Sequence, residues 1–162
     1  MNELAQALTG DSGAAPTVHI VKGLNEELVH RVVPNVTHTI YEELWYLAFW
    51  QQVSLDWIRG IETPSPAQPS DGFPSKTTAE SWEHLTSTSS RPRSRPQPPH
   101  AIPDALTNPY AARSVQALPP GSCPVRDQFI SLAAHNAYHL GRIVVLRQLH
   151  QAWPPVSGGF SW

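Results

Sequence analysis

Two histidines, His135 and His139, stand four residues apart in the segment HNAYH. In a helix, residues at this spacing lie on the same face about one turn apart, so two imidazoles can share one divalent metal ion. They would fill only two corners of the tetrahedron that Zn²⁺ prefers, and another protein group would have to complete the site. Packed or surface histidines that bind no metal also occur at this spacing, so the spacing alone does not distinguish the two.

Two long helices are predicted to position this pair. The first begins at a capping box, Thr39-Ile40-Tyr41-Glu42, and ends at Gly60, because Pro64 follows and no earlier Gly or Pro interrupts it. Its apolar residues cover two neighbouring faces, as expected of a central helix. The last helix is predicted from near Pro124 to about Gln151, ahead of two further prolines.

The remaining chain is predicted to form shorter pieces. Helical spacing restarts at Thr17, and Asn25 followed by two glutamates reads as a fresh helix start. Thirteen of the 17 prolines fall between Thr63 and Pro124, so we expect irregular loops at 61–76 and 86–107. No segment shows convincing β-type alternation. The fold class is therefore predicted to be all-α, a small bundle in one domain over residues 1–162.

The composition of the chain argues against two classes of function, nucleic-acid binding and membrane spanning. Charged residues make up 15% of the chain and the net charge is −2, which gives no electrostatic reason to bind nucleic acid. The longest apolar run, Leu44–Trp50, is far shorter than the roughly 20 residues of a membrane span. A single cysteine, Cys123, and the lack of a secretory signal lead us to expect a cytoplasmic protein.

Longer motifs in these helices resemble a known family. HTIYEELWYLAFWQ, then SWEHL, then HNAYHLGRIVVLRQLHQAWPP are similar to the DinB/YfiT-like superfamily of four-helix-bundle proteins. The resemblance covers roughly residues 17–60, 76–85 and 124–155, and it is best in the last range. It implies an up-down-down-up bundle, often a homodimer. The Pro-rich middle would replace part of the third helix.

The resemblance also implies a metal site. Family members hold Zn, Ni or a similar metal ion with three histidines, two of which match His135 and His139. The third falls on Tyr46 of LWYLAFW, so one imidazole is lost here. Known activities in the family include transferases and isomerases that use a low-molecular-weight thiol.

Several further residues are candidates for a third metal ligand or for contacts with a substrate. Tyr46 either supplies a phenolate to the metal or fills the cavity, and His19 matches a first-helix histidine of some relatives. Arg142, where relatives commonly carry glutamine, either holds an anionic substrate or faces solvent, and it would oppose a dication unless it pairs with a carboxylate. Trp50 either lines a substrate pocket or belongs to the core. We expect the other histidines to lie on the surface: His30, His38, His84, His100 and His150.

Two functions from different classes follow. The first is a metal-dependent thiol transferase or hydrolase acting on a small-molecule substrate, with a degenerate metal site at His135 and His139. The second is a metal-free bundle that acts as a binding or stress-response protein. The tyrosine at position 46 and the arginine at position 142 favour the second function, whereas the histidine pair favours the first function.

Overall fold

The structure is a computed structural model that describes residues 7, 15–59, 61, 63–74 and 125–158. Every regular element in these ranges is helical and none is a strand, so the all-α prediction is confirmed. The four-helix up-down-down-up arrangement, the predicted loop at 86–107 and Cys123 involve residues outside these ranges. The finer topology therefore stays a prediction.

Helix α4, Ile40–Ile58, begins as the sequence predicts. The Thr39 hydroxyl accepts a hydrogen bond from the Glu42 backbone N–H, and the Glu42 carboxylate accepts one from the Thr39 N–H at 2.7 Å. This reciprocal pair satisfies two backbone donors that the first turn would otherwise leave unpaired. The helix ends at Arg59, whose N–H donates to the Leu55 and Asp56 carbonyls.

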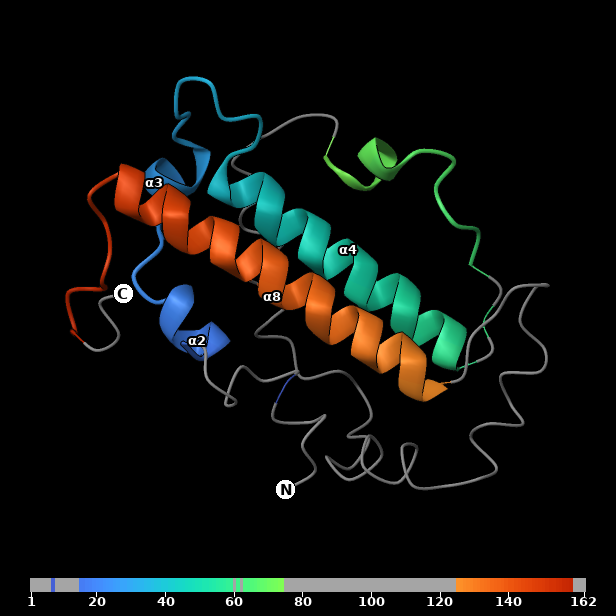
Figure 1. Ribbon diagram of the computed structural model, residues 1–162. Coiled ribbons are helices and arrows are strands. Elements are labelled where there is room, and N and C mark those ends of the chain that lie inside the picture. The colour runs from blue at the N-terminus through green and yellow to red at the C-terminus, as the bar shows by residue number, and fades with distance from the viewer. Residues whose placement is uncertain (1–6, 8–14, 60, 62, 75–124, 159–162) are drawn as a thin grey trace.

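Helix α8, Val125–Leu149, lies against α4 along most of its length, and the two run antiparallel (Figure 1). It stops two residues before the predicted end. Gln151 adopts a left-handed backbone with φ 56°, which terminates a helix, and Pro154 follows shortly after. The paired faces bury a continuous apolar core that includes Ile40, Tyr41, Leu47, Leu140, Ile143 and Leu146.

Two short helices cover the end of this pair where α4 begins and α8 ends (Figure 1). Helix α2, Thr17–Ile20, packs on α8, and helix α3, Glu26–His30, packs on α4. Gly23 separates them with φ 75°, and the Asn25 side chain accepts from the Leu28 N–H at 2.9 Å. The predicted break into short pieces and the helix start at Asn25 are thus confirmed.

The predicted loop 61–76 contains one turn of 3-10 helix, η1, Pro69–Gly72, which packs on α4. A Cβ at Gly72 would lie 2.9 Å from a ring carbon of Tyr46. The absence of a side chain at this position therefore lets the turn approach Tyr46 closely.

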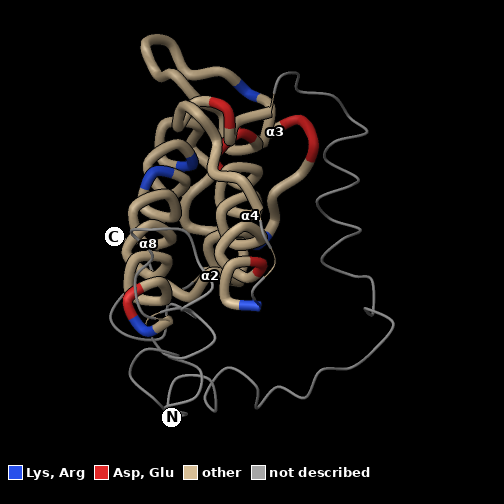
Figure 2. Tube along the Cα trace, turned by 90° about the vertical axis from the view of Figure 1, so that its right-hand side faces the viewer, with Lys and Arg blue, Asp and Glu red and all other residues tan. Residues whose placement is uncertain are grey.

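Charged residues are sparse and scattered along the two long helices, and most of both traces carries neither sign (Figure 2). No helix in the described residues is long and apolar enough to cross a membrane. The few charged side chains that lie between α4 and α8 therefore stand in a largely apolar setting, where each must find a partner.

One glycine in α8 offers a test of the helix itself. Gly141 is exposed, and a Cβ there would meet no atom within 4 Å. We expect Gly141→Ala to stabilise the protein by about 0.5–1 kcal/mol, since glycine costs that much in a helix interior. Urea unfolding measures this change in the free energy of unfolding. The control is Ala137→Gly, at an exposed site in the same helix, which should lose a similar free energy. A loss of stability in Gly141→Ala would contradict the open surroundings of this position.

Candidate functional site

A buried carboxylate connects the two long helices. Glu43, in the first turn of α4, is 0% exposed. One of its oxygens, Oε2, lies 2.5 Å from Nδ1 of His139, and the other, Oε1, accepts a hydrogen bond from Nε of Arg142 at 2.7 Å. Both partners are on α8. One carboxylate thus fixes how the two helices meet.

Local sequence places this carboxylate. The capping box starts α4 at Ile40, and Glu43 follows within the first turn, where a negative charge is favoured by the helix dipole. Its backbone N–H donates to the Thr39 carbonyl at 3.1 Å. The position of the cap therefore determines which face of α4 carries Glu43.

His139 is buried at 6% exposure. When its Nδ1–H donates to the Glu43 carboxylate, Nε2 carries the lone pair and can bind a metal ion or accept a proton. Metal-binding histidines almost always have such an outer carboxylate or carbonyl on their other nitrogen. The Glu43–His139 contact is therefore the arrangement that a ligand histidine requires.

His135 lies one turn earlier, with its ring centroid 4.4 Å from that of His139. Both of its ring nitrogens are buried and make no hydrogen bond within the described part of the chain. Burial, and then the nearby His139, lower its pKa from 6.5, while Asn136 and Glu43 act in the opposite direction. The neutral imidazole, the form that binds metal, is thereby favoured.

Tyr46 closes one side of the pair. Its ring centroid lies 4.9 Å from that of His139 and 5.4 Å from that of His135, and it stacks on Phe73 at 4.1 Å. Trp50 continues the same wall, 6.4 Å from His135, and its buried indole N–H has no acceptor among the described residues. The structure thus brings His135, His139, Tyr46 and Trp50 together.

Arg142 reaches from α8 to the buried carboxylate and is not a freely solvated arginine. Its side chain is about one third exposed and binds Glu43, and its NH1 donates to the Tyr138 hydroxyl at 3.2 Å. Burial disfavours its charge, but the Tyr138 hydrogen bond and the Glu43 carboxylate outweigh it and raise the pKa of the guanidinium. An arginine beside a divalent cation would need a carboxylate partner, and Glu43 is that partner.

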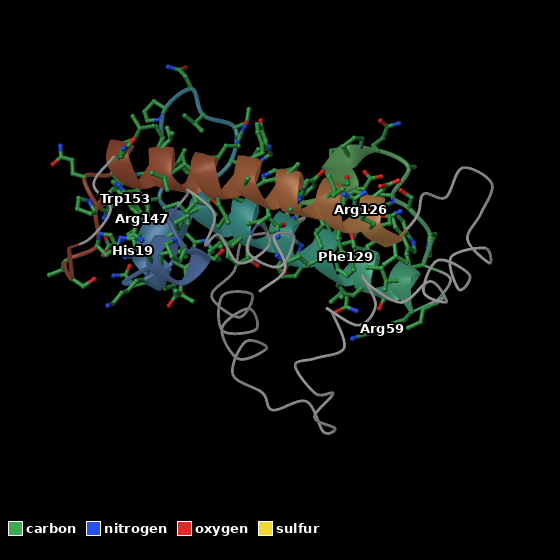
Figure 3. The ribbon with its side chains drawn as sticks, turned by 60° about the horizontal axis from the view of Figure 1, so that its bottom comes forward. His19, Arg59, Arg126, Phe129, Arg147 and Trp153 are labelled. Atoms are coloured by element: carbon green, nitrogen blue, oxygen red, sulfur yellow. The ribbon has the colours of Figure 1, made fainter. Side chains whose placement is uncertain are left out.

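The structure does not bring His19, a predicted candidate ligand, to the histidine pair. It lies on α2, and its ring packs edge-on against Trp153 at 5.5 Å, near the C-terminal end of α8 (Figure 3). Arg147 occupies the same end, where it donates to the backbone carbonyls of Ile20 and Ala152, and burial lowers its pKa. Because α2 packs near the C-terminal end of α8, His19 lies far along that helix from His135.

The prediction for the other histidines is partly wrong. His30 buries both ring nitrogens and packs on Tyr41 at 4.7 Å, because α3 folds down onto α4. His38 stacks on Phe73 at 4.0 Å and is half-buried, and His150 donates to the Arg31 carbonyl at 3.2 Å. His84 and His100 lie outside the described residues.

Sequence reasoning missed Glu43. The sequence does indicate that Glu43 is unusual. It precedes Tyr46 by three residues and Trp50 by seven, so the three side chains share one helix face that is otherwise apolar. A glutamate there is buried unless the helix turns away, and a buried carboxylate needs a cationic or hydrogen-bonding partner.

Among the described residues, no three His, Cys, Asp or Glu side chains gather as a metal-binding group. Two imidazoles are close together, and the Glu43 carboxylate is engaged by His139 and Arg142. No family model, curated protein or solved structure matches this chain.

The Glu43 contacts predict a clear effect on stability. Glu43→Gln keeps the volume but removes the charge, so Arg142 loses its ion pair, and we expect a loss of about 1–3 kcal/mol. Glu27→Gln is the matched control, because Glu27 pairs with Arg31 at an exposed site and should change stability by no more than about 0.5 kcal/mol. Equal urea midpoints for the two variants would rule out a stabilising role for the buried carboxylate.

Proposed function

We propose that this chain binds one divalent transition-metal ion through His135 and His139, with Glu43 holding His139 in position. The observation that carries the proposal is the 2.5 Å contact between Glu43 and Nδ1 of His139, one turn from a second imidazole whose nitrogens have no hydrogen-bond partner among the described residues. Buried polar groups in native proteins nearly always have partners, so an imidazole without one calls for a ligand.

The residues present fit such an ion in part. His135 is kept neutral by burial, and His139 has its outer carboxylate, which are two features of metal-binding histidines. Imidazole suits Zn²⁺ and Ni²⁺ alike. Among the described residues, the Tyr46 phenolate is the candidate for a third protein ligand, because no further His, Cys, Asp or Glu there joins the pair.

A divalent ion in this place would supply a hydroxide or a thiolate as a nucleophile at neutral pH. The chain's own residues would do the rest. Glu43 orients the His139 ring, Arg142 balances the carboxylate charge, and the Trp50 indole N–H is a donor for a substrate oxygen. We therefore propose hydrolysis, or transfer of a low-molecular-weight thiol to a small-molecule substrate, as the reaction.

Membership of the DinB/YfiT-like superfamily and a homodimeric assembly belong to the same proposal. The support is the antiparallel pairing of two long helices with the histidine pair on the last of them and Tyr46 facing it. Analytical ultracentrifugation of the full chain determines the oligomeric state.

One observation favours a second function, a metal-free bundle that binds other molecules without catalysis. The Arg142, Glu43 and His139 side chains already form a closed network in which the carboxylate is fully paired. Such a network can serve stability alone, and Tyr46 would then fill the cavity where a third imidazole is lost.

Metal analysis of untagged, chelator-stripped protein separates the two functions. We expect about one Zn²⁺ or Ni²⁺ per chain after dialysis against the metal, and a tenfold to hundredfold weaker affinity in His135→Ala, His139→Ala and Glu43→Gln. Tyr46→His should tighten binding at least tenfold by restoring a third imidazole.

His150→Ala is the matched control, because this histidine follows α8 directly and, within the part of the chain that the structure describes, contacts the Arg31 carbonyl. It should leave metal binding unchanged. No metal in the wild-type protein after addition of either ion would establish the metal-free function instead. Equal losses in His150→Ala and His135→Ala would show adventitious binding to surface histidines.

A further inference from the structure

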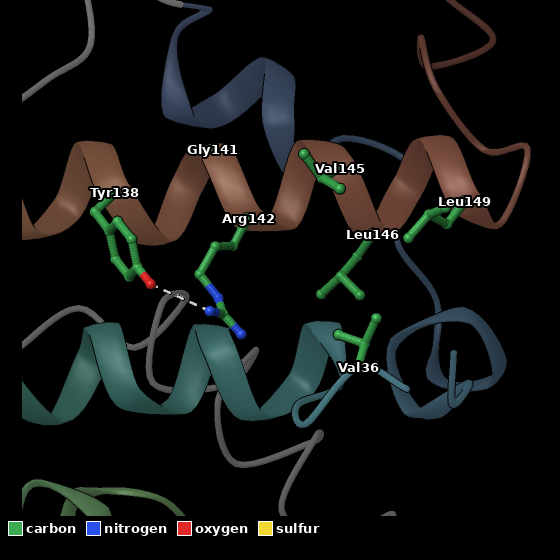
Figure 4. Close-up of a pocket in the computed structure, with 7 residues that line it drawn as sticks. All are labelled: Val36, Tyr138, Gly141, Arg142, Val145, Leu146 and Leu149. Carbon is green, nitrogen blue, oxygen red and sulfur yellow. Dashed lines mark hydrogen bonds between the residues drawn. The ribbon is translucent and has the colours of Figure 1, made fainter. Parts of the chain in front are cut away.

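An open groove runs along α8 beside Val36, and neither His135 nor His139 lines it. It has a volume of about 410 Å³, within the range of small-molecule sites (Figure 4). We call it the Arg142 groove, and its lining residues are Val36, Tyr138, Gly141, Arg142, Val145, Leu146 and Leu149.

The walls of the Arg142 groove are apolar and accessible. Tyr138, Val145 and Leu149 are 61%, 53% and 54% exposed, which is unusual for three large side chains on one helix face. Gly141 leaves the floor open, because a Cβ there would meet nothing within 4 Å. From Arg142 to Leu149 the helix rises about 10 Å, the length of a medium alkyl chain.

One end of the groove carries a positive charge with spare donors. A guanidinium has five N–H donors, and Arg142 uses one for Glu43 and one for Tyr138 within the described residues. These two contacts hold the guanidinium in a fixed orientation, and the close-up shows the one with Tyr138 (Figure 4). Among the described residues, no carboxylate lines the groove to occupy the remaining donors.

We propose that the Arg142 groove binds an amphipathic anion, a carboxylate or phosphate monoester with an unbranched apolar tail. The anionic head would accept hydrogen bonds from the free donors of Arg142, which suit planar or tetrahedral oxyanions. The tail would lie along Val145 and Leu149 toward Val36. This site does not depend on the proposed metal function.

Charge argues against a second copy of the chain as the occupant. A two-fold interface centred on Gly141 would place the two Arg142 guanidinium groups close together, and like charges across an interface are unfavourable. A ligand with one negative end and one apolar end matches both halves of the groove, whereas an apolar helix face matches only one.

Isothermal titration calorimetry with the full chain tests the proposal. The probes are decanoate and decyl phosphate, compared with decanol, which lacks the charge, and acetate, which lacks the tail. We expect saturable binding of one molecule per chain for decanoate, decyl phosphate or both, and at least tenfold weaker binding of decanol and acetate. Which of the two anions binds more tightly identifies the head group.

The matched variants are Val145→Glu and Gln148→Glu, both at exposed positions of α8, of which only the first lines the groove. Val145→Glu should weaken decanoate binding at least tenfold, and Gln148→Glu should stay within twofold. Equal effects, or decanol binding as well as decanoate, would overturn the proposal. A wild-type dimer that Val145→Glu converts to monomer would overturn it too, because the groove would then be an interface between copies.

Failure here is distinguishable from failure of the metal proposal. His135→Ala should leave decanoate binding within twofold of wild type, because His135 does not line the groove. Loss of decanoate binding in that variant would assign the ligand to the histidine pair instead.

Discussion

The burial of one carboxylate constrains the rest of the structure. Moving an ionised glutamate out of water costs several kcal/mol unless hydrogen bonds and opposite charge replace the lost solvent. Among the described residues, Glu43 meets this condition through His139 and Arg142, which stand three residues apart on α8. This double contact favours one register of the two long helices, since a shift by one turn would separate Glu43 from Arg142.

This register has consequences for every nearby group. It fixes the Nδ1 side of the His139 ring toward α4, and it places His135 one turn away among Tyr46 and Trp50. It also draws Arg142 inward so that its fork is shared between Glu43 and Tyr138. At the C-terminal end of α8, Arg147 acts differently, because its buried guanidinium binds two backbone carbonyls and tethers α2 and the following chain.

The sequence predicted those features that depend on local chemistry. The capping box at Thr39, the cap at Asn25 and the two long helices could be inferred, because each depends on residues within a few positions of one another. The neighbourhood of His135, His139 and Tyr46 was expected from the family resemblance of their motifs, and it needs only that α4 and α8 pair.

Features that depend on tertiary packing were not predicted. Glu43 was overlooked because its importance lies in which α8 residues face it, and periodicity alone does not reveal that. His19 was a candidate ligand and His30 was expected on the surface for the same reason, since nothing in their spacing tells where α2 and α3 fold onto the long helices. The close approach of Gly72 to Tyr46 likewise follows from the path of a proline-rich loop.

The protonation pattern of His139 tests the central role of Glu43 most directly. Long-range ¹H–¹⁵N NMR of the imidazoles in metal-free protein, at mildly alkaline pH, reports which ring nitrogen carries the proton. The proton is expected on Nδ1 of His139 with Nε2 bare, and added Zn²⁺ should shift that Nε2 together with one ring nitrogen of His135. A proton on Nε2, or resonances of both rings that Zn²⁺ leaves unmoved, would contradict the account.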